Sequence, residues 1–383
     1  MNIERAINID DLRRMAKRRL PRIAYDFIEG GVEDELGIAR NEAAFDRERL
    51  VPRYLVDISN RDQSADLFDR KYASPFGISA TGIAALFRPG ADLMLAESAA
   101  AANIPFMMSG MSTASIEAAA KIAPTHTWYQ LYAARKREIS LDLIRRTRDA
   151  GFGTLVLTVD VPLTPKRERN MRNGFVLPLK LKPSIVLEAL RHPAWIAGYL
   201  RHGMPRFDNW ATYAREGSSV QKVNSFAAAQ TNATVTWKDL EEFRRIWPRH
   251  LVVKGIMHRD DAVRAAAIGV DGIIVSNHGG RQLDQAPSPL EVLPGIRAAV
   301  GDKVTLMIDG GVRRGADILI ALCSGARFVF VGRATLYGAA AGGIAGVRKA
   351  ISILRGEVDL VMGQIGCTSL ADLDESFLLR PGE

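Results

Sequence analysis

A histidine and an arginine, separated by two glycines, form the stretch of this chain with the clearest chemical potential. The stretch reads Ser276-Asn277-His278-Gly279-Gly280-Arg281-Gln282-Leu283-Asp284. His278 can act as a base near neutral pH, and Arg281 is a permanent cation whose planar guanidinium matches a carboxylate. The glycines let the backbone bend tightly and approach a ligand. This combination suits the removal of a proton from a substrate that carries a carboxylate, although a glycine-rich surface turn would have the same composition.

The stretch follows a run that is predicted to be a buried strand. Gly272-Ile273-Ile274-Val275 is uncharged and rich in β-branched residues, as strands of a parallel sheet are when both faces are covered. The polar residues therefore begin where the strand ends. In α/β barrels this edge of the sheet carries the active site.

Similar apolar runs alternate with helical patterns along the chain. We predict strands at 76–80, 105–109, 127–131, 154–159, 251–254, 272–276, 304–309 and 328–332, with helices such as 90–102, 138–150, 259–268 and 313–324 between them. This alternation predicts an α/β fold, a (β/α)8 TIM barrel that forms a single domain over residues 1–383. An N-terminal helical segment at 8–30, interrupted at Pro21, precedes the barrel, and residues 40–72 are expected to wrap beneath it as a charged, irregular segment.

Every predicted strand ends in polar residues. These are Ser79 and Thr81, Ser109, Gln130 and Tyr132, Thr158 and Asp160, Lys254, Ser276 and His278, Asp309, and Arg333. Because the loops at the carboxyl ends of barrel strands converge, we expect these side chains to form one site.

Two glycine-rich loops after the last two strands predict a phosphate site. The loops read Asp309-Gly310-Gly311-Val312-Arg313-Arg314-Gly315 and Gly332-Arg333-Ala334-Thr335. Glycines free backbone N–H groups, and a helix N-terminus with basic side chains favours an anion. Barrels often bind phosphate between these loops, although ordinary strand-to-helix turns also contain glycine. The ligand is therefore expected to be phosphorylated.

The stretch from Ser276 to Asp284, with Trp128-Tyr129-Gln130-Leu131-Tyr132 and Gly332-Arg333-Ala334, resembles the motifs of the FMN-dependent 2-hydroxy acid oxidising enzymes. This family includes glycolate oxidase, lactate dehydrogenase and mandelate dehydrogenase, and the resemblance runs from about residue 8 to about residue 375. It implies FMN as cofactor. The implied cofactor residues are Ala80, Thr81, Ser109, Gln130, Thr158, Lys254, Ser276, Asp309, Gly310, Gly311, Arg313, Gly332 and Arg333.

The resemblance also implies catalytic roles. His278 would take the proton from the hydroxyl or the α-carbon of the substrate, and Asp160 would orient it. Arg167 and Arg281 would hold the substrate carboxylate. Tyr25 and Tyr132 would contact the carboxylate and the hydroxyl. The resemblance suggests a homotetramer, and the two cysteines, Cys323 and Cys367, give no metal-ligand cluster, so we expect no metal site.

Three positions bear on the type of enzyme. Gly82 lies where oxidases of the family often carry alanine and acceptor-linked dehydrogenases carry glycine, whereas Met111 and Thr164 depart from the glycolate oxidases. We therefore expect a dehydrogenase that oxidises a lactate- or mandelate-like (S)-2-hydroxy acid and passes electrons to a quinone or another acceptor. The alternatives are an oxidase that produces hydrogen peroxide and a barrel that binds a phosphorylated ligand without redox chemistry.

A long segment, about 175–236, interrupts the barrel after its fourth strand. Leu177 to Phe207 carries Lys180, Lys182, Arg191, Arg201 and Arg206 against Glu188, with Trp195, Tyr199 and aliphatic residues between them. Such a stretch could lie on an anionic membrane surface. It could equally form a lid over the substrate. Pro193 and Gly203 argue against one continuous helix.

The composition is that of a globular enzyme with a large core. The chain has 383 residues, of which 47% are hydrophobic, and a formal net charge of +8. This charge suits anionic ligands or an anionic surface, whereas the motifs of nucleic-acid binding are missing from the sequence, so we expect no nucleic-acid partner. Two cysteines and the lack of an apolar signal core favour a cytoplasmic protein, either free or peripheral on the inner face of the cell membrane.

Overall fold

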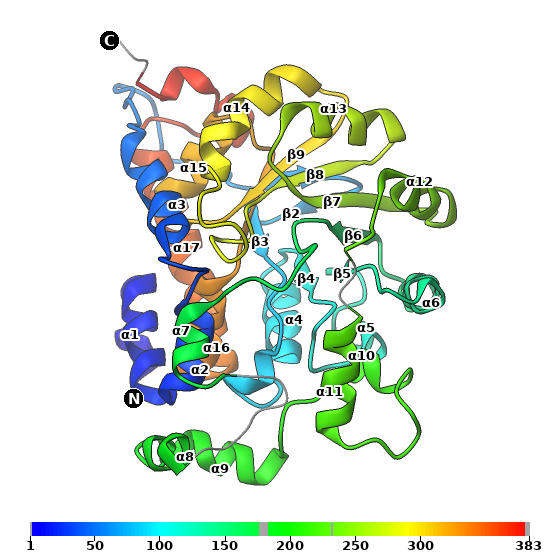
Figure 1. Ribbon diagram of the computed structural model, residues 1–383. Coiled ribbons are helices and arrows are strands. Elements are labelled where there is room, and N and C mark those ends of the chain that lie inside the picture. The colour runs from blue at the N-terminus through cyan, green and yellow to red at the C-terminus, as the bar shows by residue number, and fades with distance from the viewer. Residues whose placement is uncertain (1, 176–182, 231–232, 380–383) are drawn as a thin grey trace.

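The computed structural model describes residues 2–175, 183–230 and 233–379, and its centre is a closed barrel of parallel strands. The strands are β3 (Phe76–Ile78), β4 (Phe106–Met108), β5 (Thr127–Leu131), β6 (Thr154–Thr158), β7 (His250–Ile256), β8 (Gly272–Val275), β9 (Thr305–Asp309) and β10 (Phe328–Val331). They follow one another in chain order, and β10 closes the barrel against β3 (Figure 1). The predicted (β/α)8 barrel is confirmed.

Alternation along these strands explains why polar groups gather at one end of the barrel. The buried layer inside the barrel consists of Met107, Trp128, Val156, Val252, Ile274, Met307, Phe328 and Phe330. A side chain two positions further along a strand points to the same face. Val252 is therefore followed by Lys254, and Met307 by Asp309. An apolar layer fills the lower barrel, and a polar layer lies above it at the carboxyl ends of the strands.

A hairpin closes the opposite end. It consists of β1 (Ala65–Leu67) and β2 (Arg70–Tyr72), and its apolar side chains join the buried layer inside the barrel. The Phe68 ring stacks on His250, the first residue of β7, with ring centroids 4.4 Å apart. Only the hairpin end of the segment 40–72 thus lies beneath the barrel as predicted. The segment is not irregular throughout, because it begins with the end of α3 (Leu36–Arg47), where Asn41 hydrogen-bonds to Asn277 at the carboxyl ends of the strands.

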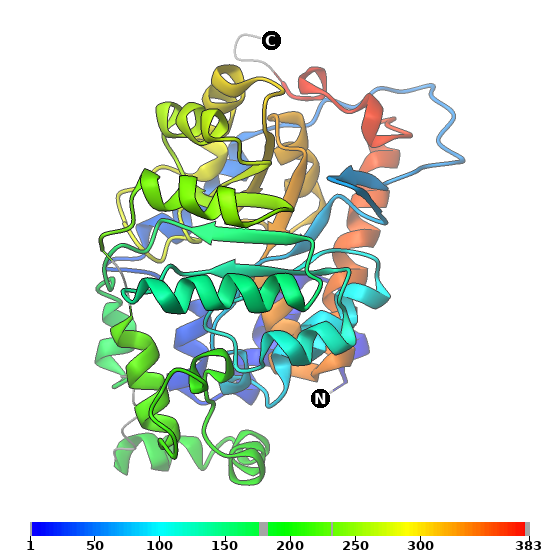
Figure 2. The same ribbon diagram turned by 90° about the vertical axis from the view of Figure 1, so that its right-hand side faces the viewer.

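Helices surround the barrel on its outside (Figure 2). They are α4 (Ala91–Ala101), α5 (Ile116–Ile122), α6 (Arg137–Asp149), α12 (Trp237–Ile246), α13 (Arg259–Ile268), α14 (Pro289–Val300), α15 (Gly315–Cys323), α16 (Arg333–Gly342) and α17 (Ile344–Gln364). Two N-terminal helices, α1 (Ile9–Arg19) and α2 (Arg22–Glu29), are separated by Pro21, as predicted, and α1 packs on α16. Since α2 ends directly beside the carboxyl ends of the strands, the N-terminal segment contributes to the site.

The segment after β6 folds into short helices instead of one long one. They are α7 (Glu168–Arg172), α8 (Pro183–Ala189), α9 (Pro193–His202), α10 (Asp208–Ala211) and α11 (Val220–Ala229). Pro193 begins α9 and Gly203 ends it, so the predicted interruptions are confirmed. The later part packs into the core, where the Trp210 indole N–H donates to the carbonyl of Gly110 at 2.8 Å.

The helices α8 and α9 lie at the outer edge of the molecule, at the bottom of Figure 1. Lys180 and Lys182, which contribute to the predicted cationic stretch, fall outside the described residues. No helix in the described part of the chain combines the length and the apolar character that crossing a bilayer requires.

Candidate active site

A cavity of about 1090 Å³ opens at the carboxyl ends of the barrel strands. Most of the predicted site residues line it: Ala80, Thr81, Ser109, Gln130, Tyr132, Thr158, Arg167, Lys254, His278, Arg281, Asp309, Gly310, Gly311, Arg313, Gly332 and Arg333. Residues far apart in the sequence therefore meet in one place, as the strand-end pattern predicted. Pockets for a single small ligand are commonly 300 to 1,000 Å³, so this cavity has room for a cofactor and a substrate together.

His278 and Asp160 form a pair at the edge of the cavity. The Nδ1 atom of His278 lies 3.0 Å from a carboxylate oxygen of Asp160, and Asp160 sits behind the imidazole instead of lining the cavity. A carboxylate only accepts hydrogen bonds, so Nδ1 must carry the proton and donate it. The other ring nitrogen, Nε2, then keeps its lone pair free to act as a base.

The surroundings keep this histidine neutral and this aspartate charged. Burial lowers the pKa of His278 below its usual 6.5, and the opposing effect of Asp160 does not reverse this. Burial alone would raise the pKa of Asp160, but His278 and Lys254 bring it below its usual value. A neutral imidazole beside a fixed carboxylate can take a proton, and the carboxylate stabilises the imidazolium that results. The left-handed backbone of His278, with φ at 59°, is a strained conformation of the kind found at functional sites.

An irregularity in β7 leaves the space that Asp160 needs beside His278. The pairing of β7 with β8 shifts register between Lys254 and Ile256, so Gly255 is an extra residue of the kind that forms a β-bulge. Gly255 has a φ of 104°, and a Cβ there would lie 2.6 Å from the Cβ of Asp160. Only glycine suits both the backbone and the space. The bulge therefore lets Asp160 pack directly against β7 while Lys254 points into the cavity.

Lys254 belongs to a buried polar network on the floor of the cavity. Its ammonium group donates to the hydroxyl of Ser276 at 2.6 Å and lies 3.1 Å from a carboxylate oxygen of Asp309. The Ser79 hydroxyl donates to the same oxygen at 2.7 Å. Ser276 is fully buried and does not line the cavity. Its hydroxyl accepts hydrogen bonds from Lys254 and from the backbone N–H of His278, and the expected place of Ser276 beside the cofactor stays a prediction.

Three half-buried arginines give the cavity a strong positive potential. Arg167, Arg281 and Arg333 line it, and no carboxylate of the described residues forms an ion pair with any of them. Burial lowers the pKa of all three, to about 10 for Arg167, and their mutual repulsion adds to the effect. Partly buried cations without carboxylate partners are costly, so this arrangement fits a site for anionic ligands.

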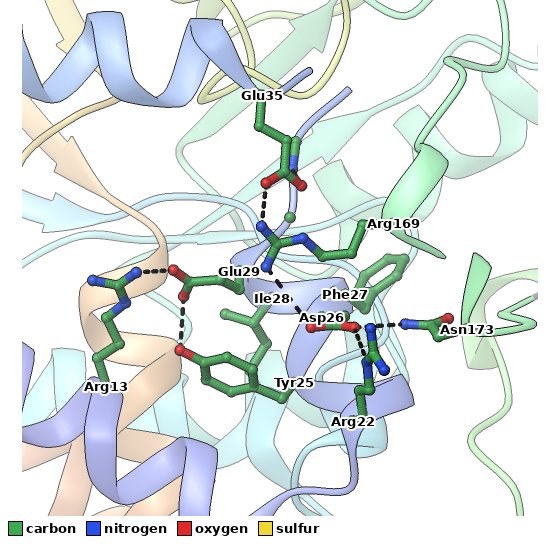
Figure 3. Close-up of polar contacts among 12 residues, drawn as sticks. Arg13, Arg22, Tyr25, Asp26, Phe27, Ile28, Glu29, Glu35, Arg169 and Asn173 are labelled. Atoms are coloured by element: carbon green, nitrogen blue, oxygen red, sulfur yellow. Dashed lines mark hydrogen bonds and ion pairs between the residues drawn. The ribbon is translucent and has the colours of Figure 1, made fainter. Parts of the chain in front are cut away.

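The structure does not bring Tyr25 to the cavity, which corrects its predicted role in substrate binding. The Tyr25 hydroxyl donates to Glu29 at 3.1 Å, and Figure 3 shows the ring turned toward Glu29 and Arg13. Phe27 takes the place expected for Tyr25. Its ring lines the cavity, with the guanidinium carbons of Arg281 and Arg167 at 5.1 Å and 5.9 Å from the ring centroid. Tyr132, in contrast, lines the cavity as predicted, and burial raises the pKa of its phenol, which therefore stays protonated as a donor.

Unsatisfied polar atoms around the cavity support a bound cofactor. Within the described residues, seven buried atoms of lining side chains lack a hydrogen-bond partner, and four of them belong to residues at or just after the ends of barrel strands: Thr81 Oγ1, Gln130 Nε2, Thr158 Oγ1 and Asp309 Oδ1. Each such atom costs about 1–3 kcal/mol unless a ligand satisfies it. They lie around the polar floor, where the carbonyl and N–H edges of a flavin ring and its hydroxylated chain would supply partners. The residues present fit the expected FMN.

The phosphate loops also have the expected form. Gly310 and Gly311 have φ values of 102° and 85°, and a Cβ at Gly311 would lie 2.3 Å from the carbonyl oxygen of Asn41 on α3. The close approach of α3 thus requires glycine at this turn. Gly332, the first turn of α16 and Arg313 line the same cavity. The Arg313 guanidinium donates one hydrogen bond to Glu42 at 2.9 Å. This end of the cavity suits a phosphate.

Sequence reasoning missed an apolar wall of the cavity. It consists of Ile83, Phe87, Met111, Val161, Met171, Phe175, Phe207, Trp210, Val235 and Leu240, most of them from the segment that follows β6. Their contribution to the site depends on how that segment folds back over the barrel, and no local motif signals it. This wall can accommodate an apolar group attached to a carboxylate-bearing ligand.

Comparison with known proteins agrees with this geometry. Residues 16–380 match the model of the FMN-dependent dehydrogenase family. The chain is 40% identical to (S)-mandelate dehydrogenase of Pseudomonas putida over 375 residues, which cover 98% of this chain and 94% of that protein. It is 39% identical to L-lactate oxidase of a Nostoc species over 380 residues, 98% of this chain and 99% of that protein. The crystal structure of the monotopic membrane protein (S)-mandelate dehydrogenase superimposes with a TM-score of 0.95 at 39% identity, covering 98% of this chain and all of the other.

Proposed function

Since the chain belongs to the FMN-dependent dehydrogenase family, we propose that it oxidises an (S)-2-hydroxy acid to the 2-oxo acid. The observation that carries this proposal is the position of the His278 and Asp160 pair beside two half-buried arginines in the cofactor cavity. A base and a carboxylate clamp in one place match the two ends of a 2-hydroxy acid. FMN, when bound, accepts the pair of electrons that the substrate loses.

The residues of the chain would share the remaining work. Arg167 and Arg281 bind the carboxylate and fix the orientation of the substrate. The Nε2 atom of His278 takes the proton, and Asp160 stabilises the charged imidazole. Tyr132, which stays protonated, donates a hydrogen bond to the substrate. Lys254 supplies a positive charge on the floor of the cavity, where negative charge develops as electrons leave the substrate.

The apolar wall supports a substrate with an apolar side chain, lactate- or mandelate-like. Phe87, Phe175 and Trp210 offer aromatic surface close to the arginines. Similarity to enzymes named for mandelate and for lactate points in the same direction.

For the electron acceptor we propose a quinone or another carrier instead of oxygen. Gly82 lines the cavity, and a Cβ at this position would lie 3.2 Å from the Cβ of Met111, so glycine leaves space that alanine would fill. Steady-state rates with oxygen and with an artificial dye distinguish the two types of enzyme. Rapid peroxide formation that the dye does not accelerate would identify an oxidase.

We also propose that α8 and α9 dock on an anionic membrane surface. Val186, Leu187, Leu190 and Leu200 are exposed by 44%, 66%, 61% and 78%, and Arg191 and Arg201 are exposed beside them. Apolar side chains next to cations suit the boundary between headgroups and acyl chains. A homotetramer would place several such surfaces on one particle, and gel filtration in detergent measures the number of subunits.

The main test is the flavin spectrum during anaerobic addition of substrate. The purified protein is expected to be yellow, and lactate, mandelate and longer (S)-2-hydroxy acids should bleach it to different extents. A colourless protein that FMN does not reconstitute would contradict the proposal. A flavin that none of these acids bleaches would contradict the substrate class alone.

A further inference from the structure

The helix that carries the carboxylate-binding Arg167 depends on neighbouring residues for its position. Arg167 is the N-cap of α7, a helix of five residues, and its Nε has no hydrogen-bond partner within the described part of the chain. So short a helix has little stability of its own. The positive charge of Arg281, which lines the same cavity, repels the guanidinium of Arg167. Contacts elsewhere on α7 must therefore keep Arg167 pointing inward.

Arg169, two residues later, makes such contacts with the N-terminal segment. Its guanidinium pairs with Glu35 and lies 3.8 Å from Asp26 on α2 (Figure 3). Asn173 donates to the other oxygen of Asp26 at 3.0 Å, and the Lys166 carbonyl accepts from the N–H of Glu33 at 3.0 Å. Contacts before, within and after α7 thus bind it to residues 26–35.

The same N-terminal segment holds the second arginine of the clamp. Arg281 donates to the carbonyl oxygens of Phe27 and Gly30 at 3.0 Å and 2.6 Å. Phe27 lies next to Asp26, with both guanidinium groups near its ring. Segment 26–35 therefore connects Arg281, through backbone carbonyls, with Arg167, through the ion pairs of Arg169.

We propose that Arg169 is a positioning residue for substrate binding: its ion pairs with Asp26 and Glu35 set the separation of Arg167 and Arg281, and so the affinity for the substrate carboxylate. Arg169 does not line the cavity and touches no substrate. The inference rests on the proposed function, because it takes Arg167 and Arg281 as the carboxylate clamp.

The test compares Arg169→Met with Arg172→Met in the flavin-loaded protein. Arg172 is a matched control, because it lies on the same helix but pairs with Glu168 inside that helix. Anaerobic stopped-flow reduction gives the Kd of the acid and the limiting rate of flavin reduction, per bound flavin. The primary amide of the same acid, used as a competing ligand, reports affinity without a carboxylate.

We expect Arg169→Met to raise the Kd of the acid roughly tenfold, because misplacement of a clamping group weakens the contact with its charged target. The limiting rate should change less than about twofold, because His278 and Asp160 keep their geometry. Affinity for the amide and all constants of Arg172→Met should stay at wild-type values. Arg169→Lys should restore part of the affinity.

An unchanged Kd for the acid in Arg169→Met would overturn the proposal, as would equal weakening of acid and amide, which indicates general disorder of the cavity. If Arg169→Met does not fold with flavin, Asp26→Asn decides: it should weaken acid binding in the same direction, and an unchanged Kd overturns the proposal. Failure of the wild-type protein to be bleached by any 2-hydroxy acid would refute the proposed function, a result separate from these.

Discussion

His278 determines how the rate should depend on pH. Burial lowers its pKa below 6.5, and only the neutral imidazole can take a proton. The rate of flavin reduction should therefore be constant around pH 7 and fall with acid, with a midpoint below pH 6.5.

His278→Ala should keep its flavin and lose roughly 100- to 10,000-fold in reduction rate. Stopped-flow reduction across pH 5–8 measures both. Wild-type reduction in the variant would show that another group is the base.

Phe27 should tune the affinity of the clamp. Its ring faces both arginines, and a cation near an aromatic ring gains about 0.5–1 kcal/mol. Phe27→Leu should therefore raise the Kd of the acid about two- to fivefold and leave the limiting rate of reduction nearly unchanged. The primary amide of the same acid is the control ligand, because it carries no carboxylate for the arginines to bind. Equal weakening of the acid and the amide in Phe27→Leu would indicate a loss of apolar packing only.

The confusion of Tyr25 with Phe27 shows what limits sequence analysis of single residues. Residues two apart on a helix point in nearly opposite directions, so one of them faces the cavity and the other does not. Tyr25 has the hydroxyl that a substrate contact would use, but Glu29 binds this hydroxyl in a separate network with Arg13 and Tyr337. The rotation of α2 depends on that network, which long-range packing creates. The position of residues at or just after strand ends, such as His278, was predictable, because the loops at the carboxyl ends of barrel strands converge.

The bulge in β7 makes Gly255 a sensitive position within an element. Alanine there would have a φ of 104° and a Cβ 2.6 Å from that of Asp160, so Asp160 would have to move. A shift of about 1 Å in a catalytic group can cost up to 100-fold in rate. Gly255→Ala should therefore lower the rate of flavin reduction by substrate roughly 10- to 100-fold. The circular dichroism spectrum and the flavin content serve as controls, and a wild-type rate would show that Asp160 tolerates displacement.

Among the elements, the barrel strands were the most predictable and α3 the least. The strands are buried on both faces, so each is a continuous apolar run that the sequence displays directly. The N-cap of helix α3, Glu35, has a left-handed backbone and makes no side-chain capping hydrogen bond, and the helix buries the polar Asn41. Asn41 forms paired hydrogen bonds with Asn277 at 2.7 Å and 2.8 Å. Such a helix is defined by its partner in the active-site loop, and neither a cap nor an apolar stripe announces it.

At the scale of the whole molecule, the segment after β6 has two surfaces of different composition. Its inner surface, with Phe207 and Trp210, belongs to the core and to the cavity, so it has a fixed place over the site. Its outer surface, on α8 and α9, exposes leucines and arginines. The composition indicated both a lid and a membrane contact, and it could not assign them to different parts. One segment can serve both, because its two surfaces face opposite ways.

If the outer surface docks on membranes, charges on its leucines should release the protein. The double variant Leu187→Asp and Leu190→Asp places two carboxylates where an anionic bilayer would lie, and both positions are more than half exposed, so the fold should tolerate them. We expect the wild-type protein to sediment with vesicles that contain anionic lipid, less so in high salt, and the variant to stay in the supernatant. Reduction of a water-soluble dye should be equal in both, because no described residue of α8 or α9 lines the cavity. Leu283→Asp, on an exposed position of an active-site loop, is the control for added charge, and equal release by that variant would show that binding reflects net charge and not these helices.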